Sequence, residues 1–216
     1  MKAFYEQQGQ RFPDENIVKF FFKEALQKQK GSVLELGCGN GNNLTLFRGF
    51  GWRTCGIDIS EGALQEAKFN FQNDSSATWL MADLGQGLPK LASSYDAILL
   101  PNINYYIPRK SFEDIMQACG RLLPSGGHFF IRARTPQDHR FGKGKEVEPN
   151  GFLLSLKETG EEGLLNVFYE PEELQEIIAK SIGPLQGKRV LRTRCDNVQN
   201  GVVITNDDVT IWGRKP

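Results

Sequence analysis

The sequence predicts an α/β fold in which a mostly parallel, doubly wound sheet is completed by an antiparallel hairpin near the C-terminus. Three observations lead to this prediction. Up to about residue 134, short apolar runs that stop at a glycine or an acidic residue alternate with segments of helical period. Two β-runs, 188–195 and 201–212, then follow each other through a short turn, which makes them antiparallel. The 216 residues contain no internal repeat or linker, so we expect one domain over 1–216.

The first elements prepare a ligand-binding turn. Residues 14–29 predict an amphipathic helix within an N-terminal helical cap, 1–30, and residues 32–36 predict the first strand. The glycines that follow this strand leave main-chain N–H groups open to a ligand where the next helix begins. Glu35, at the strand end, would repel a pyrophosphate, so the turn favours a cationic or hydroxyl-bearing ligand.

Two further strands end in acidic residues. The strand predicted over 52–59 carries Asp58, far enough after the glycine turn for one short helix, and the strand predicted over 78–83 ends at Asp83. In nucleotide-binding α/β folds, an acidic residue at the first position accepts hydrogen bonds from ribose hydroxyls. Local alternatives stay open, because Asp58 with Ser60 can cap the next helix and Asp83 can bond its own turn. Three successive strands that end in this way favour a ligand role.

The remaining elements complete the alternation. Residues 95–101 predict the fourth strand, and Ser111 is expected to cap a helix whose apolar residues follow a helical period. A proline-glycine turn ends that helix before the fifth strand, 128–134. The last helix begins at Pro171, with acidic residues in its first turn.

The run from Val33 to Gly41 resembles motif I of the class I S-adenosylmethionine-dependent methyltransferases, and the Leu-x-Pro-x-Gly-Gly turn at 122–127 resembles the same family. The resemblance implies a Rossmann-like fold with a seven-stranded sheet, and S-adenosylmethionine as cofactor with S-adenosylhomocysteine as product. It implies that the ribose binds Asp58, and that the adenine lies at Ile59, Asp83 and the backbone of Leu84. The implied cofactor-binding residues are Glu35, Gly37, Cys38, Gly39, Asn42, Asn43, Asp58, Ile59, Asp83, Leu84, Pro101 and, near the N-terminus, Arg11.

In the resembling family, the segment after the fourth strand faces the methyl acceptor. Here it reads Pro101-Asn102-Ile103-Asn104, which does not match the Asn/Asp-Pro-Pro-aromatic motif of enzymes that methylate flipped nucleobases. A nucleic-acid substrate therefore loses support. Asn104, Tyr105 and Tyr106 are candidates for acceptor contact, and the alternative for both tyrosines is packing against the following helix.

Residues 135–169 predict an acceptor-site insertion, with a β-hairpin formed by the two β-runs of 152–168. The start of this insertion overlaps with a charged segment, 132–151. We interpret this segment as a lid whose cations hold an anionic acceptor, and the alternative is a solvated loop of balanced charge. His139 is the candidate catalytic base, and core packing is the alternative for Tyr169. The acceptor-binding candidates of this region are Arg134, His139, Arg140, Lys143 and Tyr169.

Composition limits the class of partner. Basic and acidic residues number 26 each, and a formal net charge of zero disfavours nucleic acid as a partner. Four scattered cysteines and two histidines predict neither disulfides nor a metal site. No apolar run approaches the roughly 20 residues of a membrane span, so we expect a cytoplasmic protein with no membrane partner, as a monomer or homodimer.

The function that these observations favour is methyl transfer to a small-molecule acceptor, anionic if the lid interpretation holds. Two alternatives remain: an NAD(P)-dependent oxidoreductase and a non-catalytic S-adenosylmethionine-binding protein. Glu35 disfavours the oxidoreductase, as does Asn42, which stands where a dinucleotide fingerprint carries glycine or alanine.

Overall fold

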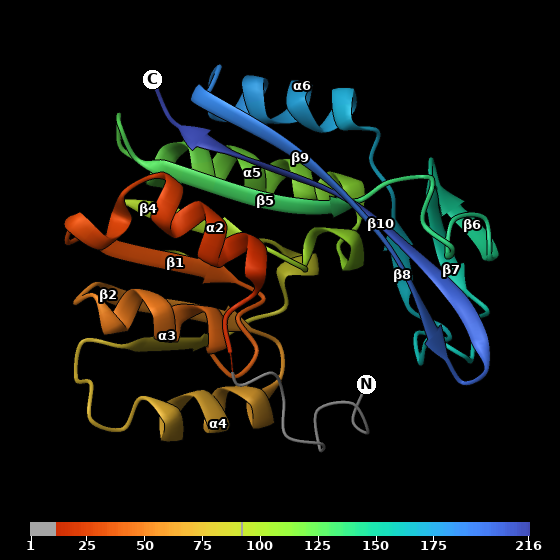
Figure 1. Ribbon diagram of the computed structural model, residues 1–216, viewed down its shortest axis with the longest axis horizontal. Helices are drawn as coiled ribbons and strands as arrows, with labels where there is room; N and C mark the ends of the chain where they lie inside the picture. The colour runs from red at the N-terminus through yellow and green to blue at the C-terminus, as the bar shows by residue number, and fades with distance from the viewer. Residues whose placement is uncertain (1–11, 92) are drawn as a thin grey trace.

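A seven-stranded sheet forms the body of the protein, with the strand order β3-β2-β1-β4-β5-β10-β9 (Figure 1). The computed structural model describes residues 12–91 and 93–216. Five strands are parallel, and β10 runs antiparallel to both β5 and β9. The bounds are β1 (Ser32–Leu36), β2 (Arg53–Asp58), β3 (Thr78–Met81), β4 (Ala97–Leu100), β5 (His128–Arg134), β9 (Gln186–Gln199) and β10 (Val202–Arg214). The predicted sheet and its antiparallel hairpin are confirmed.

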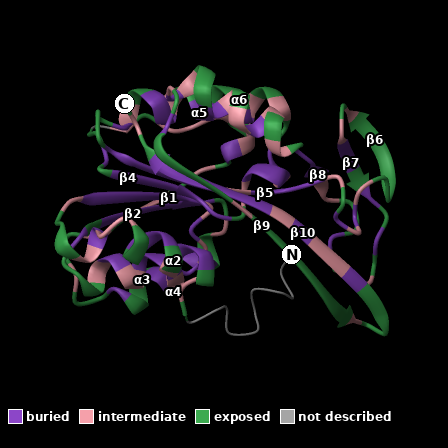
Figure 2. Cartoon of the chain, turned by 45° about the horizontal axis from the view of Figure 1, so that its top comes forward, coloured by how far each residue is buried: buried purple, intermediate pink, exposed green. Residues whose placement is uncertain are grey.

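Two hydrophobic clusters cover the two faces of this sheet. On one face, α2 (Glu15–Lys23), α3 (Asn42–Gly49) and α4 (Glu61–Asn70) pack around residues such as Phe47 and Phe130. On the other, α5 (Arg109–Leu122) and α6 (Pro171–Ser181) pack around residues such as Phe112 and Ile131. Every residue of β1 is buried, as expected for the central strand of a parallel sheet covered on both sides (Figure 2).

One helix boundary lies where the sequence predicts it, and two others do not. Ser60 caps α4 as predicted, since its hydroxyl accepts a hydrogen bond from the Ala63 N–H at 3.3 Å. The helix expected over 14–29 is wrong in extent, because Ala25 adopts a left-handed conformation (φ 56°) and the chain continues as the short 3₁₀ helix η1 (Leu26–Lys28). The cap expected at Ser111 is also wrong. Helix α5 already begins after Pro108, and the Ser111 hydroxyl donates to the Gly85 carbonyl.

A second sheet stands at the carboxyl ends of the main strands, toward which the β1 and β5 arrows point (Figure 1). It consists of β6 (Gly144–Glu148), β7 (Gly151–Leu154) and β8 (Leu165–Val167), all antiparallel. The predicted β-hairpin is present as β7 and β8. The expectation of a loop over 144–148 is wrong, because this polar stretch pairs with β7 as an edge strand. Its exposed side chains gave no apolar alternation to predict it.

The remaining elements are two 3₁₀ turns, η2 (Leu84–Gln86) and η3 (Asn104–Tyr106), which follow β3 and β4. Strand β9 forms the outer edge of the main sheet and is exposed along nearly its whole length (Figure 2). None of the helices within 12–91 and 93–216 has the length and apolar character needed to span a membrane.

Close packing of α5 on α6 depends on Gly120, because a Cβ atom there would overlap the main-chain carbonyl of Ser181. We therefore expect Gly120→Ala to lower the free energy of unfolding by about 1–3 kcal/mol through overpacking. Gly49, at the end of α3, is the matched control, because a Cβ atom there meets nothing within 4 Å. Urea unfolding should show Gly49→Ala unchanged or slightly stabilised, and equal losses in both variants would contradict the packing argument.

Candidate functional site

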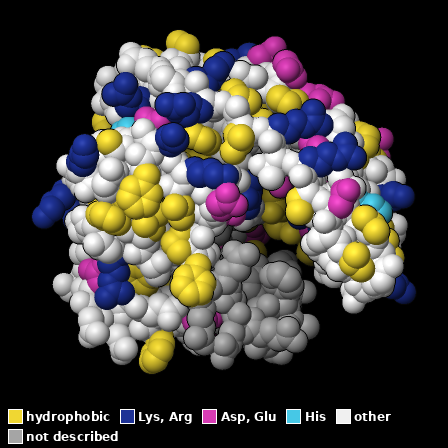
Figure 3. Space-filling model, in the orientation of Figure 1, with side chains coloured by type: hydrophobic (Ala, Val, Ile, Leu, Met, Phe, Trp, Pro, Cys, Tyr) yellow, Lys and Arg dark blue, Asp and Glu magenta, His cyan; other side chains and the backbone are white. Residues whose placement is uncertain are grey.

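The carboxyl ends of β1, β2, β4 and β5 meet at the edge that faces the second sheet, and Figure 3 shows the surface hollowed between the two. In parallel α/β sheets, ligands bind at this edge. The glycine turn after β1 lies here. It is fastened to β2, because the N–H groups of Gly37 and Cys38 both donate to the Ile57 carbonyl, at 2.8 and 3.0 Å.

Two of the turn glycines are required by close packing as well as by backbone conformation. Gly37 and Gly41 have φ angles of 71° and 79°, and a Cβ atom on either would come within 2.7 Å of a neighbouring side chain, Ile103 or Trp79. A Cβ atom at Gly39, by contrast, would meet nothing within 4 Å. The turn is thus tight against the protein at its ends and open at its middle, which is the geometry expected of a turn that receives a ligand.

Glu35 is the most unusual residue of this edge. Its side chain is buried, and Oε1 accepts a 2.6 Å hydrogen bond from the Asn43 amide. Among the residues that the structure describes, Oε2 has no hydrogen-bond partner. Burial raises the pKa of Glu35 to about 8, although the Asn43 hydrogen bond opposes this shift. A cationic ligand would supply the partner that the carboxylate lacks, so the site fits a group with an ammonium or sulfonium charge.

Asp58 holds the glycine turn and the next helix at once. Its Oδ2 accepts from the Gly39 N–H at 2.8 Å, and its Oδ1 accepts from the Ser60 N–H at 2.9 Å. Each carboxylate oxygen keeps a second acceptor position, so ribose hydroxyls can bind in addition to these contacts. The side chain of Ile59 is 57% exposed beside it, which leaves an apolar surface of the kind that an adenine ring covers.

The adenine end of the predicted site is less distinctive. Asp83 is exposed, and its Oδ1 accepts from the Gly85 N–H at 2.8 Å, which is the local turn contact that we considered as its alternative role. The side chain of Leu84 is buried in the core, so only its backbone can serve a ligand. Cys38 is buried next to Gly39, and burial raises the pKa of its thiol.

A series of hydrogen-bonded residues connects the N-terminal segment to this edge, and the sequence did not predict it. The Asn43 amide oxygen accepts from the Asp14 N–H at 2.8 Å, and the Asp14 carboxylate pairs with Arg132 at 2.8 Å. Arg132 also donates to the Pro101 carbonyl at 3.0 Å, and the Asn42 amide donates to the Phe12 carbonyl at 2.9 Å. The implied contact of Arg11 lies outside the described residues.

On the acceptor side, three candidates sit together after β4. The Tyr105 ring lies 4.0 Å below the Arg134 guanidinium, and the Tyr106 hydroxyl donates to Glu161 at 2.8 Å. Asn104 is fully buried, and neither polar atom of its amide has a partner among the described residues. A buried amide without partners is costly, so this side chain is a plausible ligand contact.

The arginines expected to hold an anionic acceptor are instead paired inside the protein. Arg134 pairs with Glu161 at 2.7 Å, while Arg140 pairs with Asp138 at 3.0 Å and also with Glu161. The two arginines lower the pKa of Glu161 to about 2 against the opposing effect of burial. The alternative of a solvated loop is therefore wrong for Arg134 and Arg140, whose charges are not free for an acceptor, whereas residues 142–147 are exposed. Among the predicted acceptor-binding cations, only Lys143 is exposed and free to meet an anionic acceptor.

Two further candidates are placed away from these contacts. The His139 imidazole lies 3.9 Å from the carboxylate of Glu158. Glu158 belongs to the turn after β7, so the acidic partner of His139 is part of the second-sheet region. Tyr169 is fully buried, with its ring against Phe112 and under the Arg109 guanidinium at 4.7 Å. This placement agrees with the core-packing alternative, and the Tyr169 hydroxyl has no hydrogen-bond partner among the described residues.

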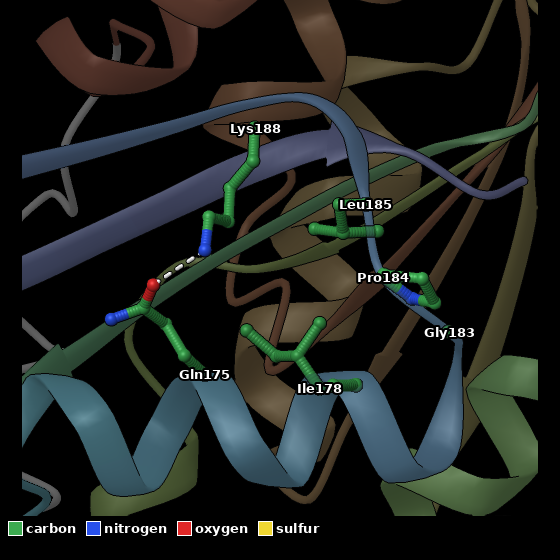
Figure 4. Close-up of a pocket in the computed structure, with 7 residues that line it drawn as sticks. Gln175, Ile178, Gly183, Pro184, Leu185 and Lys188 are labelled. Atoms are coloured by element: carbon green, nitrogen blue, oxygen red, sulfur yellow. Dashed lines mark hydrogen bonds between the residues drawn. The ribbon is translucent and has the colours of Figure 1, made fainter.

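The metal-ligating side chains and the surface hollows of the described residues add no second site. Within 12–91 and 93–216, no cluster of three or more His, Cys, Asp or Glu side chains can hold a metal ion. A shallow hollow of about 120 Å³ lies between α6 and the start of β9, lined by residues that include Ile178, Leu185 and Lys188 (Figure 4). It lies apart from the carboxyl edge, and the Lys188 ammonium in its lining donates to the Gln175 amide oxygen at 2.7 Å.

Comparison with known proteins identifies the family. A model described as "Methyltransferase domain" matches residues 5–179, which include the glycine turn, Asp58 and the segment after β4. The chain belongs to this methyltransferase family. It is also 24% identical over 170 residues to a ubiquinone biosynthesis O-methyltransferase of Dechloromonas aromatica (strain RCB), a match that covers 72% of this chain and 70% of that protein.

Solved structures agree on the fold. The N-methyltransferase NodS from Bradyrhizobium japonicum WM9, in complex with S-adenosylhomocysteine, aligns with a TM-score of 0.62 and 16% identity over 94% of this chain and 86% of its own. A SAM-dependent methyltransferase from Methanosarcina mazei aligns with a TM-score of 0.69 and 18% identity over 95% and 100%. The predicted class I S-adenosylmethionine-dependent methyltransferase is thereby confirmed, and the oxidoreductase and non-catalytic alternatives are set aside.

Replacing Asp58 should weaken cofactor binding without unfolding the protein. Loss of the ribose hydrogen bonds and of the Gly39 anchor should make Asp58→Ala bind S-adenosylhomocysteine about 10- to 100-fold more weakly, which is about 1.5–3 kcal/mol. Asp196→Ala, at an exposed position on β9, is the control. An unchanged dissociation constant in Asp58→Ala would refute the ribose assignment.

Glu35 should make stability depend on pH. Its pKa is near 4.5 when unfolded and about 8 when folded, so the folded state binds the extra proton and stability falls as pH rises between these values. In unliganded protein, the advantage of Glu35→Gln over the wild type should grow by up to about 1.4 kcal/mol per pH unit in this window. Urea unfolding at pH 5 and pH 8 measures it, with exposed Glu176→Gln as control. A difference that is the same at both pH values would contradict the burial of this carboxyl.

Proposed function

We propose that this methyltransferase acts on a small, hydroxyl-bearing molecule that binds between η3, the end of β5 and the second sheet. The observation that carries the proposal is the attachment of the second sheet over this edge. Glu161, from the turn between β7 and β8, reaches both Arg134 at the end of β5 and Tyr106 in η3. A site closed in this way suits a small acceptor better than a macromolecule, because a polymer needs an extended open surface.

The chemistry requires the protein chiefly to position and to exclude water. S-adenosylmethionine, when bound, supplies a methyl group on a positively charged sulfur that leaves as a neutral thioether. We assign to Glu35 the balance of cationic charge and to Asp58 the ribose. The N–H groups of the turn glycines already donate within the protein, contrary to the expectation from the sequence, so the turn serves the cofactor through its open surface at Gly39. Asn104 and Tyr105 then orient the acceptor for attack from the side opposite the sulfur.

An oxygen nucleophile is the acceptor atom that the relatives favour. The curated relatives, at 24% and 26% identity, are both named O-methyltransferases, and the second match spans 42% of that protein. We propose an anionic substituent on the acceptor only near Lys143 and Lys145, which are exposed just before and within β6. The arginines of the same region are already neutralised by carboxylates.

Glu161 tests whether the second sheet serves the acceptor. Glu161→Gln weakens the links to Arg134, Arg140 and Tyr106, so methyl transfer to phenols and hydroxybenzoates should fall roughly tenfold or more, while S-adenosylhomocysteine affinity stays within about twofold. Glu162→Gln is the matched control, because the neighbouring side chain is exposed. Radiolabelled methyl transfer and calorimetry measure the two quantities. Loss of cofactor binding with normal acceptor kinetics would show that the second sheet serves the cofactor instead.

A further inference from the structure

Asp208 occupies a position at the catalytic edge that the sequence analysis did not identify. In the antiparallel pairing of β10 with β5, Asp208 lies opposite Arg134, the last residue of β5. Residues opposite each other in an antiparallel pair project from the same face of the sheet. Asp208 therefore shares the face of Arg134 and Arg132, at the end of β5 where the acceptor is proposed to bind.

The acids around Asp208 are all paired with arginines, and Asp208 is not. Four ion pairs lie here: Asp14–Arg132 at 2.8 Å, Glu161–Arg134 at 2.7 Å, Asp138–Arg140 at 3.0 Å and Asp207–Arg192 at 3.1 Å. Among the described residues, no hydrogen bond or ion pair engages the Asp208 carboxylate. Arg134, its partner in the sheet register, turns instead toward Glu161 and the Tyr105 ring.

The surroundings of Asp208 favour the exchange of a proton. The residue is half-buried, and burial raises the pKa of its carboxyl above the usual range, while the arginines of β5 offset part of this rise. The charged and titratable groups that face it are Arg132 and Arg134 from β5, Asp138 and Arg140 from the segment after β5, and Tyr105 from η3. On β9, the residue in register is Thr193, which is uncharged.

We propose that Asp208 is the general base that removes the proton from the acceptor hydroxyl, an inference that rests on the proposed function. In the balanced step, the acceptor oxygen forms a bond to the methyl carbon as the carbon–sulfur bond breaks. The electron pair of that bond stays on sulfur, and the hydroxyl proton passes to the Asp208 carboxylate and later to water. An unpaired carboxylate is suited to this role, because an arginine-bound one would be a weaker base.

The alternative role for Asp208 is to balance the positive charge of the nearby arginines. The two roles differ in their dependence on the acceptor atom. The cysteine thiol ionises near pH 8.5 and a phenol near pH 10 in model compounds, and an aromatic thiol ionises more readily than an alkyl one, so an aromatic thiol acceptor needs a protein base much less. A residue that only balances charge would affect both acceptors alike.

The test compares wild type, Asp208→Asn and Asp208→Glu on two matched probe pairs, phenol with benzenethiol and 4-hydroxybenzoate with 4-mercaptobenzoate. Assays run at pH 7, where only about one phenol in a thousand is ionised, and exposed Asp196→Asn on β9 serves as control. Thermal unfolding and S-adenosylhomocysteine affinity are measured on every variant to establish that folding and cofactor binding are intact.

The proposal predicts that Asp208→Asn lowers kcat/KM on the hydroxyl probes about 100-fold or more and on the thiol probes less than about threefold, with Asp208→Glu restoring part of the loss. Equal losses on both probe types, or no loss on either, would overturn the assignment of Asp208. A wild-type enzyme that methylates the thiol probes and neither hydroxyl probe would instead contradict the hydroxyl acceptor of the proposed function.

Discussion

The buried carboxyl of Glu35 is the constraint around which the cofactor side of this protein is organised. It stands at the end of the central strand, where burial opposes ionisation and a single amide from Asn43 supports it. The same Asn43 accepts from Asp14, which pairs with Arg132, which donates to the carbonyl of Pro101. One continuous set of contacts thus joins the N-terminal segment, α3, β5 and the end of β4 around a carboxyl that lacks a full complement of partners. Such an arrangement costs stability in the empty protein and is reasonable only if a ligand completes it.

The acceptor side is built on a different principle. Its charged residues are many, yet most of them are used to hold the second sheet against the main sheet, with Glu161 at the centre of the network. Removing either partner of a buried ion pair is strongly unfavourable. These contacts therefore fix the position of the second sheet more than they recognise a substrate. In the proposed site, recognition of the acceptor is then left to groups without internal partners. The described residues that stand out in this respect are Asn104, next to Tyr105 in η3, and Asp208, whose charge acts on Tyr105.

The strands and the glycine turn were predictable because their signals are local. A buried parallel strand is a continuous apolar run, and a ligand-binding turn needs glycines at the strand end, so 32–36 and the turn after it could be read from consecutive residues. The acceptor side was not predictable in the same way. The pairing of Arg134 with Glu161 joins residues distant in sequence, and nothing near Arg140 distinguishes a buried arginine from a solvated one. Asp208 was missed for the same reason, since only the register of β10 on β5 brings it to the edge. The predicted start of α5 was wrong because two local signals, Pro108 and Ser111, competed.

The central claim is that the glycine turn, Glu35 and Asp58 together form a site for S-adenosylmethionine. The most direct measurement is isothermal titration calorimetry of the unmodified protein with S-adenosylhomocysteine and, separately, with NADH. The account predicts saturable binding of S-adenosylhomocysteine with one site per chain and no heat of binding from NADH. Binding of NADH without a response to S-adenosylhomocysteine would contradict it.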